Sequence, residues 1–134
     1  MRIVLDSNVL LVSIGIRSRF RPIWQAFITG KYELAVSEDI LHEYEEILQE
    51  HSANGVAELV MDIFAESPDI VYQHVYYNWD AIKKDRDDNK FFDVAIAASV
   101  DFLVTNDAHF KEAAKLKFPK VNIVSADAFL EILE

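Results

Sequence analysis

The 134-residue sequence contains no cysteine. Disulfide bonds and thiolate zinc sites are therefore excluded, and any bound metal would need oxygen or imidazole ligands. No apolar run approaches the ~20 residues of a membrane span, because Asp6 interrupts the first apolar stretch and no small-residue cleavage site follows it. We therefore expect a soluble, cytoplasmic protein that does not engage a membrane.

Positive charge is also scarce, with 13 lysine and arginine residues against 23 aspartate and glutamate residues and a net charge of −10. This balance argues against a general nucleic-acid coat, since non-specific binding needs many basic contacts to phosphate. It is compatible with a nuclease, because clustered acids hold divalent cations that then meet phosphate. The placement of the acids therefore decides between these classes.

The chain shows no internal repeat or low-complexity tract, and its length suits one domain, residues 1–134, with a real core. Short strands are predicted to alternate with helices, which favours an α/β sandwich with a mostly parallel sheet. Expected strands cover 2–6, 32–37, 69–82, 101–105 and 121–125, and expected helices cover 7–14, 21–30, 38–51, 53–67, 89–100, 107–116 and 126–134.

Acids follow the expected strands. Asp6 closes the first strand, Asp107 lies just past the strand 101–105, and Glu43 lies about two turns into the helix after the second strand. In open parallel sheets the site lies outside the carboxyl ends of the strands. Carboxylates gathered there repel unless a cation or protons compensate, so a cluster indicates a metal site.

Each acid alone also has a structural explanation. Asp6 and Asp107 fit helix caps, and Glu43 fits a solvated group with Glu45 and Glu46. The acids at 85, 87 and 88 fit the start of a helix, where negative charge is favourable. Asp93 is harder to explain in this way, because its helix is apolar almost all round and a buried carboxylate needs a partner.

Three segments, "IVLDSNVLL", "YELAVSEDILHEYEEIL" and "DRDDNKFFDVAIAASVDFLVTNDAHF", together span nearly the whole chain. In order and spacing they resemble the PIN-domain ribonucleases, most closely the VapC-related branch of toxins from toxin–antitoxin pairs. The resemblance implies a PIN-like three-layer α/β/α sandwich with a mostly parallel sheet of four to five strands. It also implies Mg²⁺- or Mn²⁺-dependent RNA cleavage that leaves a 3′-hydroxyl and a 5′-phosphate.

Carried over by position, the resemblance implies a set of catalytic acids, namely Asp6, Glu43, Asp88, Asp93 and Asp107. The implied metal ligands are Asp6, Asp88, Asp93 and Asp107, with the choice between Asp88 and Asp93 left open. Glu43 would complete the metal site or orient the attacking water. The implied substrate-lining residues are Ser7, Asn8 and Thr105; Ser7 stands where relatives more often have threonine, and Asn106 where they often have glycine.

The resemblance further implies an RNA substrate, a cognate antitoxin protein and a homodimer. Two basic groups are candidate RNA contacts or solvated faces: Arg17, Arg19 and Arg21, and Lys83, Lys84, Arg86 and Lys90. The aromatic residues Tyr72, Tyr76, Tyr77 and Trp79 are interpreted as core or dimer interface in preference to a base-stacking surface. The four histidines lack metal-ligand spacing, so surface or packing roles are expected.

Two other functions compete. A phosphatase with an aspartate nucleophile would need a second acid two positions after the first, and position 8 is Asn. A catalytically idle PIN-like domain used for binding or regulation is the second alternative, which the presence of all the matched acids disfavours.

Overall fold

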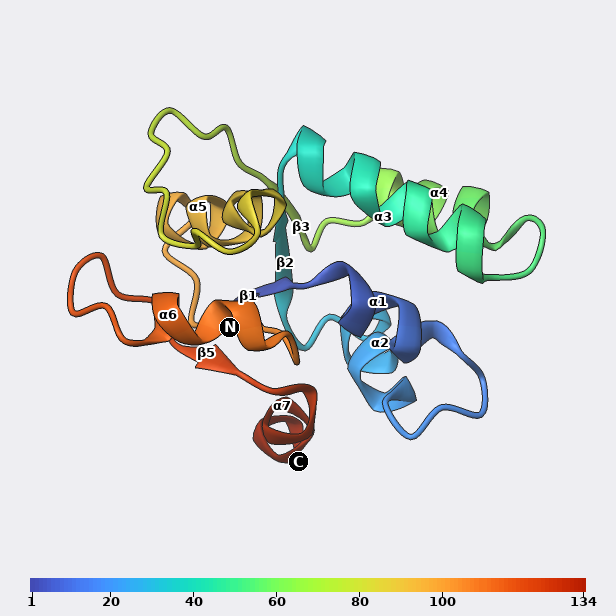
Figure 1. Ribbon diagram of the computed structural model, residues 1–134. Coiled ribbons are helices and arrows are strands. Elements are labelled where there is room, and N and C mark those ends of the chain that lie inside the picture. Colours follow the sequence, from blue (N-terminus) through green and yellow to red (C-terminus); the bar gives the residue numbers. More distant parts are fainter.

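The computed structural model describes residues 1–134 and contains five strands and seven α-helices (Figure 1). The strands are β1 (Arg2–Leu5), β2 (Glu33–Val36), β3 (Ile70–Tyr72), β4 (Phe102–Val104) and β5 (Ile123–Val124). The helices are α1 (Ser7–Ile14), α2 (Arg21–Ile28), α3 (Glu38–His51), α4 (Val56–Glu66), α5 (Asn89–Ala97), α6 (Lys111–Ala114) and α7 (Ala126–Leu133), with 3₁₀ turns η1 (Arg86–Asp88) and η2 (Ala108–Phe110).

The strands form one all-parallel sheet in the order β3-β2-β1-β4-β5. The chain moves from β1 through β2 to the β3 edge, and then crosses back to β4 on the other side of β1. The order therefore reverses between β1 and β4, where Leu5 pairs with Val104. In such sheets this reversal opens a crevice at the carboxyl ends of the two strands. The expected α/β fold with a largely parallel sheet is confirmed.

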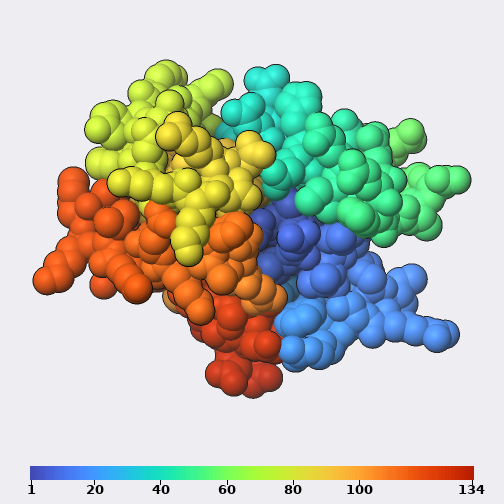
Figure 2. Space-filling model, viewed as in Figure 1, coloured from blue at the N-terminus to red at the C-terminus, as the bar shows by residue number.

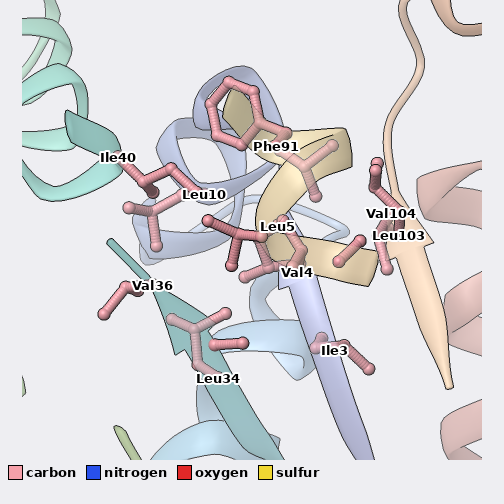
Figure 3. Close-up of a cluster of buried hydrophobic side chains, with 14 of the residues drawn as sticks. Ile3, Val4, Leu5, Leu10, Leu34, Val36, Ile40, Phe91, Leu103 and Val104 are labelled. Atoms are coloured by element: carbon pink, nitrogen blue, oxygen red, sulfur yellow. The ribbon is translucent and has the colours of Figure 1, made fainter. Parts of the chain in front are cut away.

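Helices cover both faces of the sheet, as a parallel sheet requires. Figure 1 shows α1 to α4 on one side of the strands and α5 with α6 on the other. Apolar side chains of β1, β2 and β4 meet those of α1, α3 and α5, including Leu10, Ile40 and Phe91, in one buried cluster (Figure 3). None of the helices combines the length and apolar character needed to cross a membrane.

Local sequence signals account for several helix starts. The hydroxyl of Ser37 accepts a hydrogen bond from the Ile40 amide at the start of α3, and Ser125 caps α7 in the same way through Ala128. Pro22 lies in the first turn of α2, where its missing amide hydrogen costs nothing. These three predicted helix starts are confirmed.

Three predicted element boundaries are wrong. The aromatic stretch 69–82 contributes only Ile70–Tyr72 to the sheet, because its partner β2 ends at Val36. The helix predicted over 89–100 ends at Ala97, and Ser99 adopts a left-handed conformation with φ of 52° before β4 begins. The helix predicted over 107–116 is split into η2 and the short α6.

Candidate functional site

Asp6 lies at the carboxyl end of β1, beside the end of β4, where the strand order reverses. Its backbone amide donates to the carbonyl of Val104, and its carboxylate Oδ2 accepts a hydrogen bond of 2.7 Å from the Thr105 hydroxyl. The side chain makes no capping hydrogen bond to α1, so the interpretation of Asp6 as a simple helix cap is wrong. Asp6 is 5% exposed. The fold thus holds a buried carboxylate at the point where the strand order reverses.

Glu43 on α3 contacts the residue that follows Asp6. Its Oε2 accepts a hydrogen bond from the hydroxyl of Ser7, and its Oε1 lies 2.7 Å from Nζ of Lys90 on α5. Both carboxylate oxygens of Glu43 are therefore engaged by other elements. Glu43 is thus more than a member of a solvated acidic group.

Asp107 lies beyond the end of β4. Its backbone amide donates to the hydroxyl of Thr105 over 3.0 Å, and its Oδ1 accepts from the amide of His109 over 2.8 Å. Asp107 therefore does cap the short turn η2, as one interpretation of the sequence held. The hydroxyl of Thr105 links two acids, because it donates to Asp6 and accepts from the Asp107 amide.

Asp88 ends the turn η1 and immediately precedes α5. Its Oδ2 lies 3.5 Å from Nδ1 of His109, and both atoms are buried without a hydrogen-bond partner. Nδ1 of His109 also lies 3.4 Å from Oδ1 of Asp107 and 3.9 Å from Oδ2 of Asp85. The two atoms face each other at a distance too long for a good hydrogen bond, which leaves room for a ligand between these side chains.

The charges of these acids act on one another. Burial, reinforced by the charges of Asp85, Asp107 and Asp6 and opposed by the neighbouring His109 side chain, raises the pKa of Asp88 to about 6. Burial also raises the pKa of Asp6, the charges of Glu43 and Asp107 add to this rise, and the Thr105 hydrogen bond opposes it. Asp6, Glu43, Asp88 and Asp107 therefore form one electrostatically coupled cluster.

Asp93 lies in different surroundings. Its Oδ1 accepts a hydrogen bond of 3.1 Å from the backbone amide of Trp79, and burial raises its pKa, with a smaller contribution from Asp80. It lines a cavity of about 260 Å³ together with Lys90 and residues that follow β2 and β3. None of the four clustered acids lines that cavity. The structure therefore groups Asp88, and not Asp93, with the other predicted acids.

The substrate-lining candidates also differ from one another. Ser7 and Thr105 are buried and bind Glu43 and Asp6, respectively, whereas Asn8 is exposed at the start of α1. Sequence reasoning did not place His109 or Asp85 in the site. The position of His109 two residues after Asp107 was the only available signal, since a short turn there returns the side chain towards the acid.

The donor set fits a divalent cation that prefers oxygen ligands. Asp85, Asp88 and His109 each offer one ligand atom, and these atoms lie within 4.8 Å of one another. The buried, unpaired atoms of Asp88 and His109 belong to this group. Carboxylate oxygens suit Mg²⁺ and Mn²⁺, and an imidazole nitrogen is compatible with Mn²⁺.

Residues 2–109 match the family model described as PIN domain, and the chain therefore belongs to the PIN-domain family. This confirms the family resemblance noted in the sequence. A search of curated proteins found no significant match.

Solved structures show the same fold at low sequence identity. VapBC2 from Rickettsia felis, bound to a promoter DNA fragment, aligns at 18% identity with a TM-score of 0.64, covering 93% of this chain and 98% of that one. VapC20 of Mycobacterium tuberculosis, described as a Sarcin-Ricin loop cleaving toxin, aligns at 13% identity with a TM-score of 0.61, covering 86% and 97%. FitAB bound to the IR36 DNA fragment aligns at 14% identity with a TM-score of 0.59, covering 92% and 94%.

Proposed function

We propose that this PIN-domain protein is a metal-dependent endoribonuclease in which Asp6, Asp88 and Asp107 hold Mg²⁺ or Mn²⁺, with Asp85 and His109 as neighbouring ligands beside Asp88. The observation that carries the proposal is the buried, unpaired Oδ2 of Asp88 within a cluster of mutually repelling carboxylates. A bound cation would relieve both the repulsion and the missing contact. Membership of the PIN-domain family supports the same assignment.

Such a cation would activate water near neutral pH and stabilise the charge that develops at phosphorus during displacement. The chain's own residues orient the ligands. Thr105 fixes the rotamer of Asp6 through its hydrogen bond and ties Asp107 to the same point. Ligands held in this way lose little freedom when the cation and substrate bind.

Glu43 has a positioning role in this proposal, because Ser7 and Lys90 already engage its two oxygens. It orients an attacking water from the side of α3 and keeps Lys90 beside the acids. The side chain of Lys90 is 20% exposed, and its ammonium group supplies positive charge for an incoming phosphate. Asp93 is assigned to a different task, the attachment of the loop that contains Trp79 to α5.

We further propose that the nuclease acts as the toxin of a toxin–antitoxin pair and forms a homodimer. The fold similarity to VapBC2, VapC20 and FitAB supports this role. Expression in a bacterial host tests it. The wild-type chain should slow growth, whereas Asp6→Asn should not, and co-expression of a cognate antitoxin should restore growth to the wild-type culture.

The direct test of the proposed activity is cleavage of a mixed RNA pool by the purified protein with Mn²⁺, Mg²⁺ or EDTA. We expect cleavage with either metal, none with EDTA, and a loss of about 100-fold or more in Asp6→Asn, as is typical when a group that acts in the reaction is removed. Asp62→Asn is the matched control, because Asp62 is exposed on α4 far along the chain from the cluster.

The alternative is an idle PIN-like domain that binds RNA or protein without cleaving. Folded wild-type protein and Asp6→Asn that are equally inactive with every metal and RNA pool would favour that alternative. Equal cleavage by both proteins would instead point to a contaminating nuclease and remove support for the proposed site.

A further inference from the structure

Three aromatic side chains outside the acidic cluster are strongly exposed: Tyr76 by 90%, Tyr77 by 64% and Phe118 by 81%. They come from two loops, one between β3 and α5 and one between α6 and β5. Trp79 connects the loops, since its ring centroid lies 4.5 Å from that of Tyr77 and 5.9 Å from that of Phe118. An exposed patch of this kind commonly marks an interaction site.

The first of these loops has no regular secondary structure, but its second half is held by hydrogen bonds to α5 and α6. The side chain of Asn89 accepts from the Ile82 amide and donates to the Ile82 carbonyl, at 2.8 and 2.9 Å. Asp93 accepts from the amide of Trp79, and Glu112 on α6 accepts from the amide of Lys83. The loop is therefore anchored at Gln73, whose amide donates to the carbonyl of Val36, and again from Trp79 onward, on either side of the two tyrosines.

Positive charge is concentrated beside the same patch, although the chain as a whole carries −10. The segment 111–120 contains one glutamate and four exposed lysines, Lys111, Lys115, Lys117 and Lys120. No lysine of this segment forms a salt bridge, and neither does Lys83 or Lys84. The other basic candidates are partly occupied, as Arg19 pairs with Asp127 and Lys90 with Glu43.

Figure 2 shows the two segments, yellow-green and orange, as adjoining surfaces on one side of the molecule. The lysine segment begins four residues after Asp107, and the aromatic loop leads into Asp85 and Asp88. In sequence, each loop therefore runs between the patch and residues of the acidic cluster.

We propose that this aromatic–lysine surface, formed by Tyr76, Tyr77, Phe118, Lys115 and Lys117, binds single-stranded RNA. Unpaired bases stack on the exposed rings, and the neighbouring ammonium groups contact the phosphates, a combination that suits single strands. The inference rests on the proposed nuclease function and deepens it, because it assigns the substrate a single-stranded form and a path to the acids.

A second copy of this chain is the competing occupant. A two-fold contact through this surface would place one lysine segment against the other, and like charges facing one another disfavour association. A polyanion has the opposite sign and is favoured by the same lysines. The charge distribution therefore favours RNA over self-association at this surface.

The test is fluorescence anisotropy with a labelled 12-nucleotide RNA, single-stranded or annealed to its complement, with Asp6→Asn protein in EDTA so that no cleavage occurs. We expect the single strand to bind more tightly than the duplex. Replacement of both Tyr76 and Tyr77 with Ala should weaken single-strand binding about tenfold or more, since each stacked base contributes substantially. Lys115→Gln with Lys117→Gln should reduce the salt slope of binding by about 1.4.

The matched controls are Leu59→Ala, an exposed apolar residue on α4, and Lys31→Gln, an exposed lysine before β2. Both should bind RNA like the parent. Unchanged RNA binding in the tyrosine and lysine variants would overturn the inference, and so would equal affinity for duplex and single strand, or no RNA binding at all. Loss of dimer in the tyrosine variant with unchanged RNA binding would assign the surface to a second copy.

The same measurements separate this inference from the proposed function. If the wild type cleaves RNA with metal and the surface variants cleave it equally well, the proposed RNA-binding surface is wrong but the nuclease function is supported. If RNA binding depends on the surface but no metal supports cleavage, the binding surface is supported and the nuclease function is wrong.

Discussion

Asp88 and Asp93 are five residues apart and both have raised pKa values, but Asp93 is buried whereas Asp88 is partly exposed, and their surroundings differ. Asp93 has a hydrogen bond from the Trp79 amide and one nearby acid that contributes to its pKa shift. Asp88 has a buried oxygen without a partner and three acids that contribute. Burial alone therefore does not separate the two acids; the hydrogen bonds each one makes and the charges around it do, and these favour Asp88 as the proposed metal ligand.

The largest expected effect comes from making the same change at both positions. Asp88→Asn should reduce RNA cleavage about 100-fold or more, because the amide retains the shape but no longer supplies a charged ligand. The cleavage rate of Asp93→Asn should stay within about threefold of the wild type, because the amide oxygen still accepts the hydrogen bond from Trp79. Such a change is far smaller than the loss expected when a catalytic group is removed. Initial cleavage rates at saturating Mn²⁺ measure both.

Circular dichroism spectra and melting temperatures of the two variants serve as the control for folding. Equal losses of activity in folded variants would show that Asp93 also takes part in the site, and the contrast between the two residues would then disappear.

The next effect concerns Asn89, which attaches the loop between β3 and α5 to the start of α5. Asn89→Ala removes both hydrogen bonds to Ile82 and leaves its buried amide and carbonyl unpaired. We expect the free energy of unfolding to fall by about 2–3 kcal/mol, since each unpaired buried group is costly. Urea denaturation measures this fall, with Asn54→Ala, an exposed residue between α3 and α4, as control. Equal stability of the two variants would contradict the role of Asn89.

The third prediction uses the sign of the pKa shifts. The pKa of Asp88 is raised to about 6 in the folded state from 3.8, and those of Asp6 and Asp93 are raised as well. The folded protein therefore binds more protons than the unfolded chain between these values, so these groups increase the stability of the metal-free protein as pH falls from about 7 to about 4. Thermal melting in EDTA across this range measures the change.

Stabilisation by Mn²⁺ should have the opposite pH dependence in the same thermal melting measurements. The metal requires ionised carboxylates, so it should raise the melting temperature more at pH 7.5 than at pH 5. Asp88→Asn should flatten the pH dependence of the metal-free protein, whereas Asp62→Asn should leave it unchanged. A metal-free protein that is steadily less stable as pH falls towards 5 would contradict the raised pKa of Asp88.

The sequence was sufficient for the parts of the fold that depend on local pattern. Strand ends located Asp6 and Asp107, and Ser37 and Ser125 marked helix starts, because capping and the sheet edge follow from neighbouring residues. The prediction of a strand over 69–82 was wrong for a physical reason. The alternation of this stretch resembles a strand, but Tyr76 and Tyr77 lie beyond the end of the partner strand and are exposed, so neither belongs to the core.

The choice between Asp88 and Asp93 could not be made from sequence. Both acids border the same apolar helix, and only the docking of the loops decides which one meets the carboxyl ends of β1 and β4. His109 escaped notice for a similar reason, since its contact with Asp88 joins two turns, η1 and η2, that approach each other only in the folded chain. Side chains positioned by long-range loop packing leave little local signal, and for His109 it was only the spacing of two residues from Asp107.

The smallest expected effect concerns Thr105, whose hydroxyl connects Asp6 with the Asp107 amide. Thr105→Val retains the shape but removes the hydroxyl, so Asp6 is oriented less well and metal affinity should fall about tenfold, as for other groups that orient metal ligands. Thr105→Ser retains the hydroxyl and should bind Mn²⁺ like the wild type in isothermal titration calorimetry. If valine and serine bind Mn²⁺ equally well, Thr105 contributes packing alone, and the cluster is organised by its carboxylates without help from the strand end.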